Sequence, residues 1–265
     1  MNNSRRKFLR LAGFATLGLG VKPALDLVGH AVPDALATSE QPQYAPNPKA
    51  LKAKQWGMVI DTKKLTTPEQ FDKIINACHS IHNVPSIPET KTEIKWIWGE
   101  DFSGSFTDNE QPYLPEDVEH KKFLLLCNQC GDPACVRVCP TKATFKRESD
   151  GIVMMDMHRC IGCRFCMAAC PYGARSFNFG DPRPYVEKPN PTFPTRMRGV
   201  VEKCTFCYER LDEGLLPACV EASEGAILFG DLDDPKSEVR QALRENFTIR
   251  RKPTLGTQPS IYYII

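Results

Sequence analysis

The sequence predicts an α+β fold built from two related halves, one of which is inserted within the other. Three observations lead to this expectation. Two consecutive cysteine-rich runs, CNQCGDPACVRVCP at 127–140 and CIGCRFCMAACP at 160–171, share the same arrangement of cysteines and a final proline. A third run, CTFCYERLDEGLLPACVEAS at 204–223, repeats part of this pattern. Stretches of glycine, apolar residues and an acid precede the cysteine-containing segments: GMVID at 57–61, GIVMMD at 151–156 and GVVE at 199–202.

Each element is expected from a local pattern. The three glycine-to-acid stretches are interpreted as short strands that lead into the cysteine loops. Alternating stretches after the runs are also expected to be strands: KATFKR at 142–147, ARSFNF at 174–179 and GAILFGD at 225–231. Asp150 and Gly151 predict a hairpin turn. Helices are expected after the second and third cysteines of each run. One more is expected over 235–246, opened by Asp234-Pro235 with the proline at the first helical position.

The spacing of the first two runs is that of bacterial ferredoxins, which makes both halves ferredoxin-like. In that motif three cysteines bind one 4Fe-4S cluster and the fourth binds the neighbouring cluster. The fourth cysteine lies a helical turn beyond the third and is carried away from the first cluster. Ligands are therefore expected to be exchanged between the runs. One cluster is assigned Cys127, Cys130, Cys135 and Cys170, and the second is assigned Cys160, Cys163, Cys166 and Cys139.

The third run lacks its fourth cysteine. It supplies Cys204, Cys207 and Cys219, but Ser223 stands at the fourth position. The one remaining cysteine is Cys78, and exchange predicts a third cluster on Cys204, Cys207, Cys219 and Cys78. The ferredoxin offsets before Cys78 fall on Pro68, Phe71 and Ile74, so a fourth cluster has lost all four of its ligands. The twelve cysteines then form three complete clusters with none left over.

Residues 66–76 are the place of the lost cluster. This region is expected either to contact another redox protein or to be a closed end. In the alternative interpretation, Phe71 and Ile74 fill the volume that the cluster has vacated. His79 and His82 flank Cys78, and we expect hydrogen bonding or surface exposure for them rather than a role as iron ligands.

Other uses of the cysteines are less consistent with the pattern. Zinc ribbons also contain paired C-x2-C elements, but they do not require a third and fourth cysteine or a final proline. Disulfides would form only if the chain met an oxidising compartment while unfolded. The sequence contains no dinucleotide-binding glycine fingerprint, P-loop, zincin motif or haem-attachment C-x2-C-H. We therefore expect no catalytic site in this chain.

The first residues look like a twin-arginine export signal, assigned to residues 1–37. Its features are two arginines at 5–6, a stretch of eleven uncharged residues at 11–21 and small residues at 35–37. The uncharged stretch is too short to span a bilayer as a helix, and a basic amphipathic surface helix is the alternative. Export of the folded protein to the periplasm would let the clusters form in the cytoplasm first, which protects the cysteines from oxidation.

Composition sets further limits. The formal net charge is +2, and no basic patch indicates nucleic-acid binding. Outside the signal no apolar segment approaches the length of a membrane span, so membrane attachment is expected only through a partner. A linker is expected over 38–54. The first half is assigned to 55–119 together with 199–265 and one cluster, and the second half to 120–198 and two clusters.

These motifs together resemble the iron–sulfur subunits of the dimethyl sulfoxide reductase beta-subunit family, including those of polysulfide, tetrathionate and nitrite reductases. The resemblance covers residues 55–265, and the chain departs from the four-cluster pattern at Pro68, Phe71, Ile74 and Ser223. Within the family, three clusters, a twin-arginine signal and ACHSIHNVP at 77–85 are most similar to the DsrO-like periplasmic subunits of the membrane complex associated with dissimilatory sulfite reductase.

The resemblance implies an electron-transfer subunit that does no substrate chemistry itself. The implied partners are a polytopic quinone-interacting membrane subunit and a multihaem cytochrome c or other redox subunit. The alternative is the electron-transfer beta subunit of a molybdopterin oxidoreductase. Trp96 and Trp98 alternate as in a strand, so one is expected to face the core and the other a partner. The stretch IYYII at 261–265 is expected to be either an edge strand or a docking surface for the membrane subunit.

Overall fold

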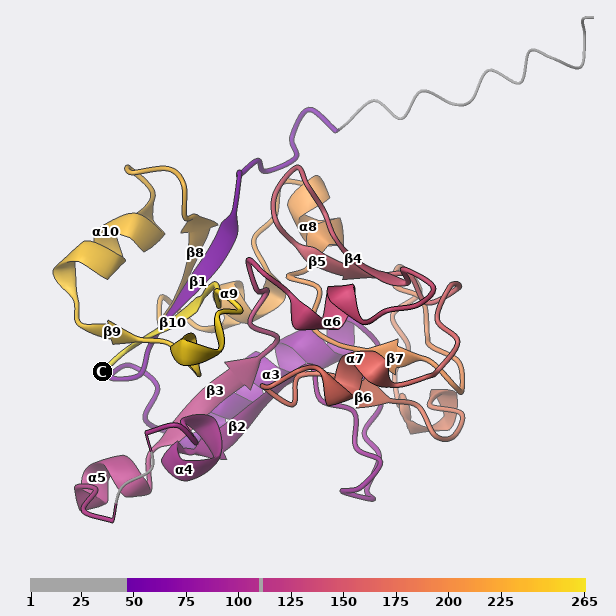
Figure 1. The fold of residues 1–265 in the computed structure, drawn as a ribbon, viewed down its shortest axis with the longest axis horizontal. Helices are drawn as coiled ribbons and strands as arrows, with labels where there is room; N and C mark the ends of the chain where they lie inside the picture. The colour runs from indigo at the N-terminus through magenta and orange to yellow at the C-terminus, as the bar shows by residue number, and fades with distance from the viewer. Residues whose placement is uncertain (1–46, 110–111) are drawn as a thin grey trace, which may run out of the picture. The chain divides into compact units, whose positions relative to one another are not determined.

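The computed structural model describes residues 47–109 and 112–265 (Figure 1). The expected export signal at 1–37 and the first part of the expected linker lie outside the described residues. The remainder of the linker is packed, since the Leu51 amide donates a hydrogen bond to the Leu211 carbonyl. Within the two described ranges, no helix is both long enough and apolar enough to cross a membrane.

The largest sheet has four strands in the order β8-β1-β10-β9. The central strand β1 pairs antiparallel with β8 and parallel with β10, so that Met58 lies opposite both Phe229 and Ile261. Helix α10 packs on this sheet through Val239 and Ala242. The bounds are β1 Trp56–Asp61, β8 Ile227–Asp231, β9 Thr248–Ile249, β10 Ile261–Ile264 and α10 Glu238–Glu245.

The structure excludes one of the two alternatives for 261–265, the edge strand, while the docking surface stays a prediction, and it corrects the expected start of one helix. Strand β10 lies between β1 and β9 and is therefore not an edge strand. A local pattern reveals an apolar strand but not how many partners it has. Helix α10 begins at Glu238 and not at Pro235, because the Ser237 side chain caps it by accepting a hydrogen bond from the Arg240 amide. Asp234 forms a turn instead, in which its carboxylate accepts from the amide of Lys236.

Three two-stranded antiparallel sheets complete the strand structure. The pairs are β2 Ile97–Asp101 with β3 Lys122–Leu126, β4 Thr144–Lys146 with β5 Val153–Met155, and β6 Ser176–Phe177 with β7 Val201–Glu202. The β4–β5 hairpin turns where Asp150-Gly151 predicted it, and Gly151 has a left-handed φ of 77°. The first and third pairs join strands on opposite sides of the expected boundaries at 119 and 198. The division into two inserted halves stays a prediction.

Short helices carry or adjoin the cysteines. They are α6 Ala134–Arg137, α7 Phe165–Ala168, α8 Tyr208–Asp212 and α9 Ala218–Ala222. Further short helices are α4 Phe102–Ser105, α5 Glu116–Glu119 and the 3-10 turns Arg183–Tyr185 and Pro253–Leu255.

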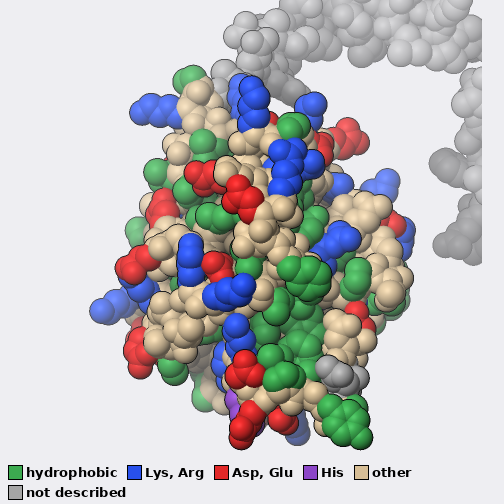
Figure 2. Space-filling model, turned by 90° about the vertical axis from the view of Figure 1, so that its left-hand side faces the viewer, with side chains coloured by type: hydrophobic (Ala, Val, Ile, Leu, Met, Phe, Trp, Pro, Cys, Tyr) green, Lys and Arg blue, Asp and Glu red, His purple; other side chains and the backbone are tan. Residues whose placement is uncertain are grey.

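The face that carries α10 and α5 shows basic and acidic side chains interspersed, with apolar side chains gathered in its lower part (Figure 2).

Helix α3 occupies Pro68–Ile81, the segment in which a fourth cluster loop was inferred to be lost. It begins with proline at its first position, which suits a helix start because that amide needs no partner. The Gln70 side chain accepts hydrogen bonds from the amides of Thr66 and Thr67. Phe71, Ile74 and Cys78 recur at helical spacing and form its buried face. The helix packs against α9 and β2.

Candidate cluster-binding sites

The first set of thiols surrounds a small cavity of about 20 Å³ that Tyr172 and Arg175 also line. We call it site 1; its cysteines are Cys127, Cys130, Cys135 and Cys170. The loop after β3 brings two of them, helix α6 brings the third, and the end of α7 brings the fourth. Burial, together with the other three cysteines of the site, raises the pKa of Cys130 to about 12.

A second set lines a cavity of about 10 Å³. We call it site 2; its cysteines are Cys139, Cys160, Cys163 and Cys166. Cys139 follows α6 and joins three cysteines that come from the loop before α7 and from α7 itself. The structure thus brings together the same two sets of four that ligand exchange groups in the sequence.

The third set, site 3, is more deeply buried. Its cysteines are Cys78, Cys204, Cys207 and Cys219, all of them buried. They come from α3, from the loop between β7 and α8, and from α9. Burial raises the pKa of Cys78 well above its usual range, and the other three thiols raise it further because they lie close by.

The three loops share a backbone feature that the sequence alone does not reveal. The residue before the second cysteine is left-handed in each loop, with φ values of 43° at Gln129, 69° at Gly162 and 57° at Phe206. Only the middle position is glycine, and a Cβ added there would lie 2.5 Å from the Gly199 carbonyl oxygen. The close approach of Gly199, together with the positive φ, requires glycine at this position.

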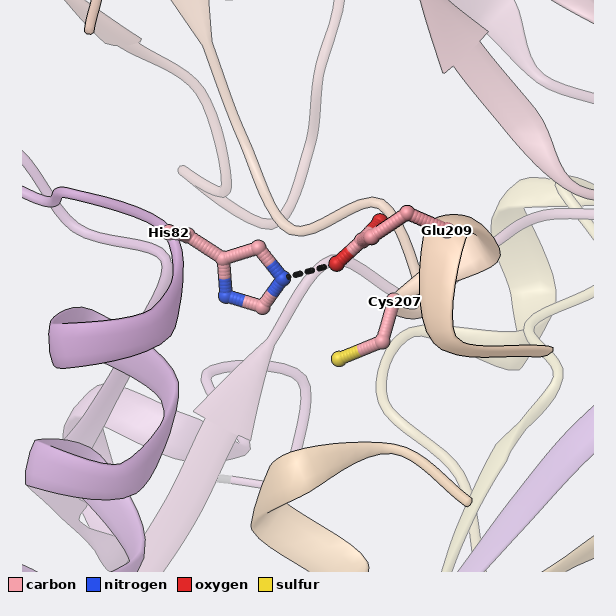
Figure 3. Close-up of side chains that lie close together, drawn as sticks. All are labelled: His82, Cys207 and Glu209. Carbon is pink, nitrogen blue, oxygen red and sulfur yellow. Dashed lines mark hydrogen bonds and ion pairs between the residues drawn. The ribbon is translucent and has the colours of Figure 1, made fainter. Parts of the chain in front are cut away.

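Cys78 has two histidine neighbours with different surroundings. His82 Nε2 lies 2.7 Å from Glu209 Oε1, and its Nδ1 lies 2.7 Å from the Cys78 carbonyl oxygen and 3.6 Å from the Cys78 sulfur. Figure 3 shows that Cys207 belongs to the same group, in which the ligand atoms of His82, Cys207 and Glu209 lie within 4.8 Å of one another. The Glu209 contact orients the imidazole, which agrees with the expected hydrogen-bonding role. His79 is half-buried, and this partial burial lowers its pKa to about 4.

A second layer of residues encloses site 3. Arg196 donates hydrogen bonds to the backbone carbonyls of His82 and Asn83 and forms a buried ion pair with Glu202, at 2.7 Å. Glu202 also accepts a 2.8 Å hydrogen bond from the indole of Trp96, whose ring stacks on His82. Trp96 is therefore a core residue that precedes β2. Trp98 is only partly buried and packs against the same core.

The positions at which the sequence predicts the loss of a fourth cluster have other roles in the structure. Ser223 donates to the Val220 carbonyl and accepts from the Ile227 amide, so its hydroxyl joins the end of α9 to β8. Ile74 and Phe71 are both buried in the core, and Phe71 also lines, with Pro68, an open groove of about 780 Å³. Ile74 and Phe71 thus fill part of the core, and Phe71 borders a surface groove as well.

The thiol sets fit iron–sulfur clusters. All twelve cysteines are free. Burial opposes a negative charge on these sulfurs, and it raises the pKa of Cys219 to about 12. A metal centre overcomes that cost because its positive charge deprotonates the thiols that bind it.

Sequence reasoning missed four charged residues around the sites, since ordinary charged residues carry no spacing pattern. They are Glu209, Arg196, Arg175 and Lys203.

Comparison with known proteins gives an independent result. A domain family described as "4Fe-4S dicluster domain" matches residues 118–181, which contain the cysteines of sites 1 and 2. The chain is 40% identical to the Hdr-like menaquinol oxidoreductase iron-sulfur subunit 1 of Archaeoglobus fulgidus, over 98% of this chain and 97% of the relative. It is 37% identical to the menaquinone reductase iron-sulfur cluster-binding subunit of Nitratidesulfovibrio vulgaris, over 79% of this chain and 88% of the relative. It is 32% identical to a tetrathionate reductase subunit of Salmonella typhimurium, over 100% of this chain and 89% of the relative.

Proposed function

This chain belongs to the family of iron–sulfur subunits of oxidoreductases that includes those of menaquinol oxidoreductase and tetrathionate reductase, and we propose that it carries three 4Fe-4S clusters and relays electrons within such a complex. The observation that carries the proposal is the division of twelve cysteines into three sets of four. The protein supplies the thiolate ligands and the surroundings of each cluster, and the clusters supply the redox chemistry.

The three sites adjoin one another in the order 2, 1, 3. Cys166 of site 2 interacts electrostatically with Cys135 of site 1, and Cys204 of site 3 interacts with Cys127 of site 1. Clusters held at these sites would form a continuous row. Electrons entering at one end would reach the other by short steps through site 1.

We propose that the row connects a quinone-interacting membrane subunit with a multihaem cytochrome or another redox subunit, in a periplasmic DsrO-like subunit of a sulfur-metabolism complex. The name of the menaquinol oxidoreductase relative supports the quinone partner. The chain reaches the periplasm folded, by the twin-arginine route, and associates with the membrane through its partners. The second candidate function, a beta subunit of a molybdopterin oxidoreductase, is supported by the tetrathionate reductase relative, whose match covers the whole chain.

Anaerobic purification with iron, sulfide and zinc analysis tests the cluster assignment. Three clusters require about twelve irons and twelve sulfides per chain. Cys78→Ala is expected to remove or alter one cluster and leave the other two, whereas the exposed control Ser80→Ala keeps all of the iron. Stoichiometric zinc, or full iron with unchanged cluster spectra in Cys78→Ala, would contradict the proposal. Co-purification distinguishes the two functions, because a haem protein supports the first and a molybdenum-containing subunit supports the second.

A further inference from the structure

Two buried cations lie among the cysteine sites without a carboxylate partner. Arg175 is 4% exposed and Lys203 is 0% exposed. Another buried cation, Arg196, is paired with the carboxylate of Glu202. Neither Arg175 nor Lys203 forms an ion pair with any residue in the described part of the chain. An unpaired buried charge is costly, so these two cations need a negative partner.

Arg175 lies at the junction of sites 1 and 2. Its Nη2 donates to the Cys135 sulfur at 3.0 Å and to the Thr144 hydroxyl at 2.8 Å. Its Nη1 lies 3.8 Å from the sulfur of Met155, a residue that lines the cavity of site 2. One guanidinium therefore contacts the surroundings of both sites.

Lys203 lies at the junction of sites 1 and 3. Its ammonium donates to the carbonyl of Cys204, at 2.8 Å, and to the carbonyl of Val153, which lines the cavity of site 1. The Gln129 side chain, from the site 1 loop, binds the same two residues by donating to the Cys204 carbonyl and accepting from the Val153 amide. These contacts hold the ammonium between the two loops.

We infer that Arg175 and Lys203 set the reduction potentials of the clusters on both sides of them, an inference that rests on the proposed function. Reduction adds one negative charge to a cluster, and a nearby buried cation stabilises that charge. Net charge and hydrogen bonds to the sulfurs are established determinants of cluster potential. Each cation raises the potentials of its two neighbours, and the cluster at site 1 is affected by both. Arg251 is also buried, but it contacts the Ser105 carbonyl and the Tyr172 ring and forms no hydrogen bond with a thiol within residues 47–109 and 112–265.

Redox titration followed by electron paramagnetic resonance tests this inference. Cys130→Ala, Cys163→Ala and Cys207→Ala assign the signals of sites 1, 2 and 3. Arg175→Gln is expected to lower the potentials at sites 1 and 2 by at least a tenfold change in the one-electron equilibrium, about 59 mV, and to leave site 3 unchanged. Lys203→Gln should lower the potentials at sites 1 and 3 and leave the potential at site 2 unchanged.

The controls separate charge from structure. Arg175→Lys keeps the charge and is expected to retain the wild-type potentials. Arg137→Gln removes an exposed arginine that pairs with Asp132 and lies in sequence between two ligand cysteines. This variant should shift none of the three reduction potentials. A second variant is used if Arg175→Gln fails to assemble. The Met155 sulfur lies 3.8 Å from Arg175 Nη1, so the carboxylate of Met155→Glu would neutralise the guanidinium. Met155→Gln is the uncharged control. Only the glutamate variant is expected to lower the potentials at sites 1 and 2.

Three results would overturn the inference: unchanged potentials, equal shifts at all three sites in both variants, or the same potentials in Met155→Glu and Met155→Gln. The iron content of the wild-type protein is measured first. Absence of iron there would refute the proposed function itself, whereas full iron with unshifted potentials would refute only the role of the two cations.

Discussion

Replacing Ile74 with alanine tests whether α3 is a structural substitute for a lost cluster loop. Ile74 is 1% exposed and lies on the buried face of the helix one turn before Cys78. The change removes three carbon atoms, worth about 0.8 kcal/mol each in transfer free energy, and the cavity left behind adds to this cost. We expect a loss of about 3 kcal/mol in the free energy of unfolding. For a domain of this size that lowers the melting temperature by about 6–12 °C.

The measurement is the apparent melting temperature under anaerobic conditions at one fixed scan rate, because bound clusters make unfolding irreversible. The matched control is Ile75→Ala, since Ile75 is only partly buried and should cost about 1 kcal/mol. Iron content and the rate of cluster reduction by a soluble viologen are expected to stay at wild-type values. Equal melting temperatures for the two variants would refute the filling role. A slower reduction rate with unchanged stability would instead favour electron transfer at this end of the chain.

Three further predictions concern the enclosure of site 3, helix α10 and the loop of site 2. Arg196→Met leaves Glu202 buried and unpaired, which should cost about 3–5 kcal/mol; wild-type melting would contradict this. Ser237→Ala removes the side-chain cap of α10 and should cost about 1 kcal/mol, with faster amide exchange in the first turn as the local measure and unchanged exchange as the contrary result. Gly162→Ala places a Cβ 2.5 Å from the Gly199 carbonyl oxygen, so site 2 should lose iron while the other sites keep theirs; full iron would rule out this steric explanation.

Local patterns predicted the strands because alternation and turn residues are properties of a few neighbouring positions. Strands β4 to β8 all fall within the stretches that the sequence indicated. The spacing of the cysteines gives the sets of sites 1 and 2, and Cys78 joins site 3 because it is the one cysteine left over. The structure brings the thiols of each set together, and their role as cluster ligands stays a prediction. What local patterns do not contain is the choice of partner. The parallel pairing of β1 with β10 joins residues about 200 positions apart and depends on the packing of the whole sheet.

Helix α3 shows how one pattern can hide another. Ferredoxin offsets before Cys78 fall on Pro68, Phe71 and Ile74, where the sequence predicts that ligands have been lost. The same residues carry a helix signal, with proline at the first position and apolar residues at helical spacing.

Arg175 and Lys203 were missed for a different reason. Lysine and arginine are usually exposed, and only the fold reveals that these two are buried beside thiols.

The position of β1 at the centre of its sheet has a consequence for synthesis. Strands β8 and β10, its two neighbours, are made by the ribosome long after β1 itself. Until then a nascent β1 exposes the backbone donors and acceptors of both edges together with its buried side chains Met58, Val59 and Ile60. Such long-range pairing folds slowly and leaves unpaired strands open to aggregation. Chaperone protection during translation would therefore matter most for the segment around residues 56–61.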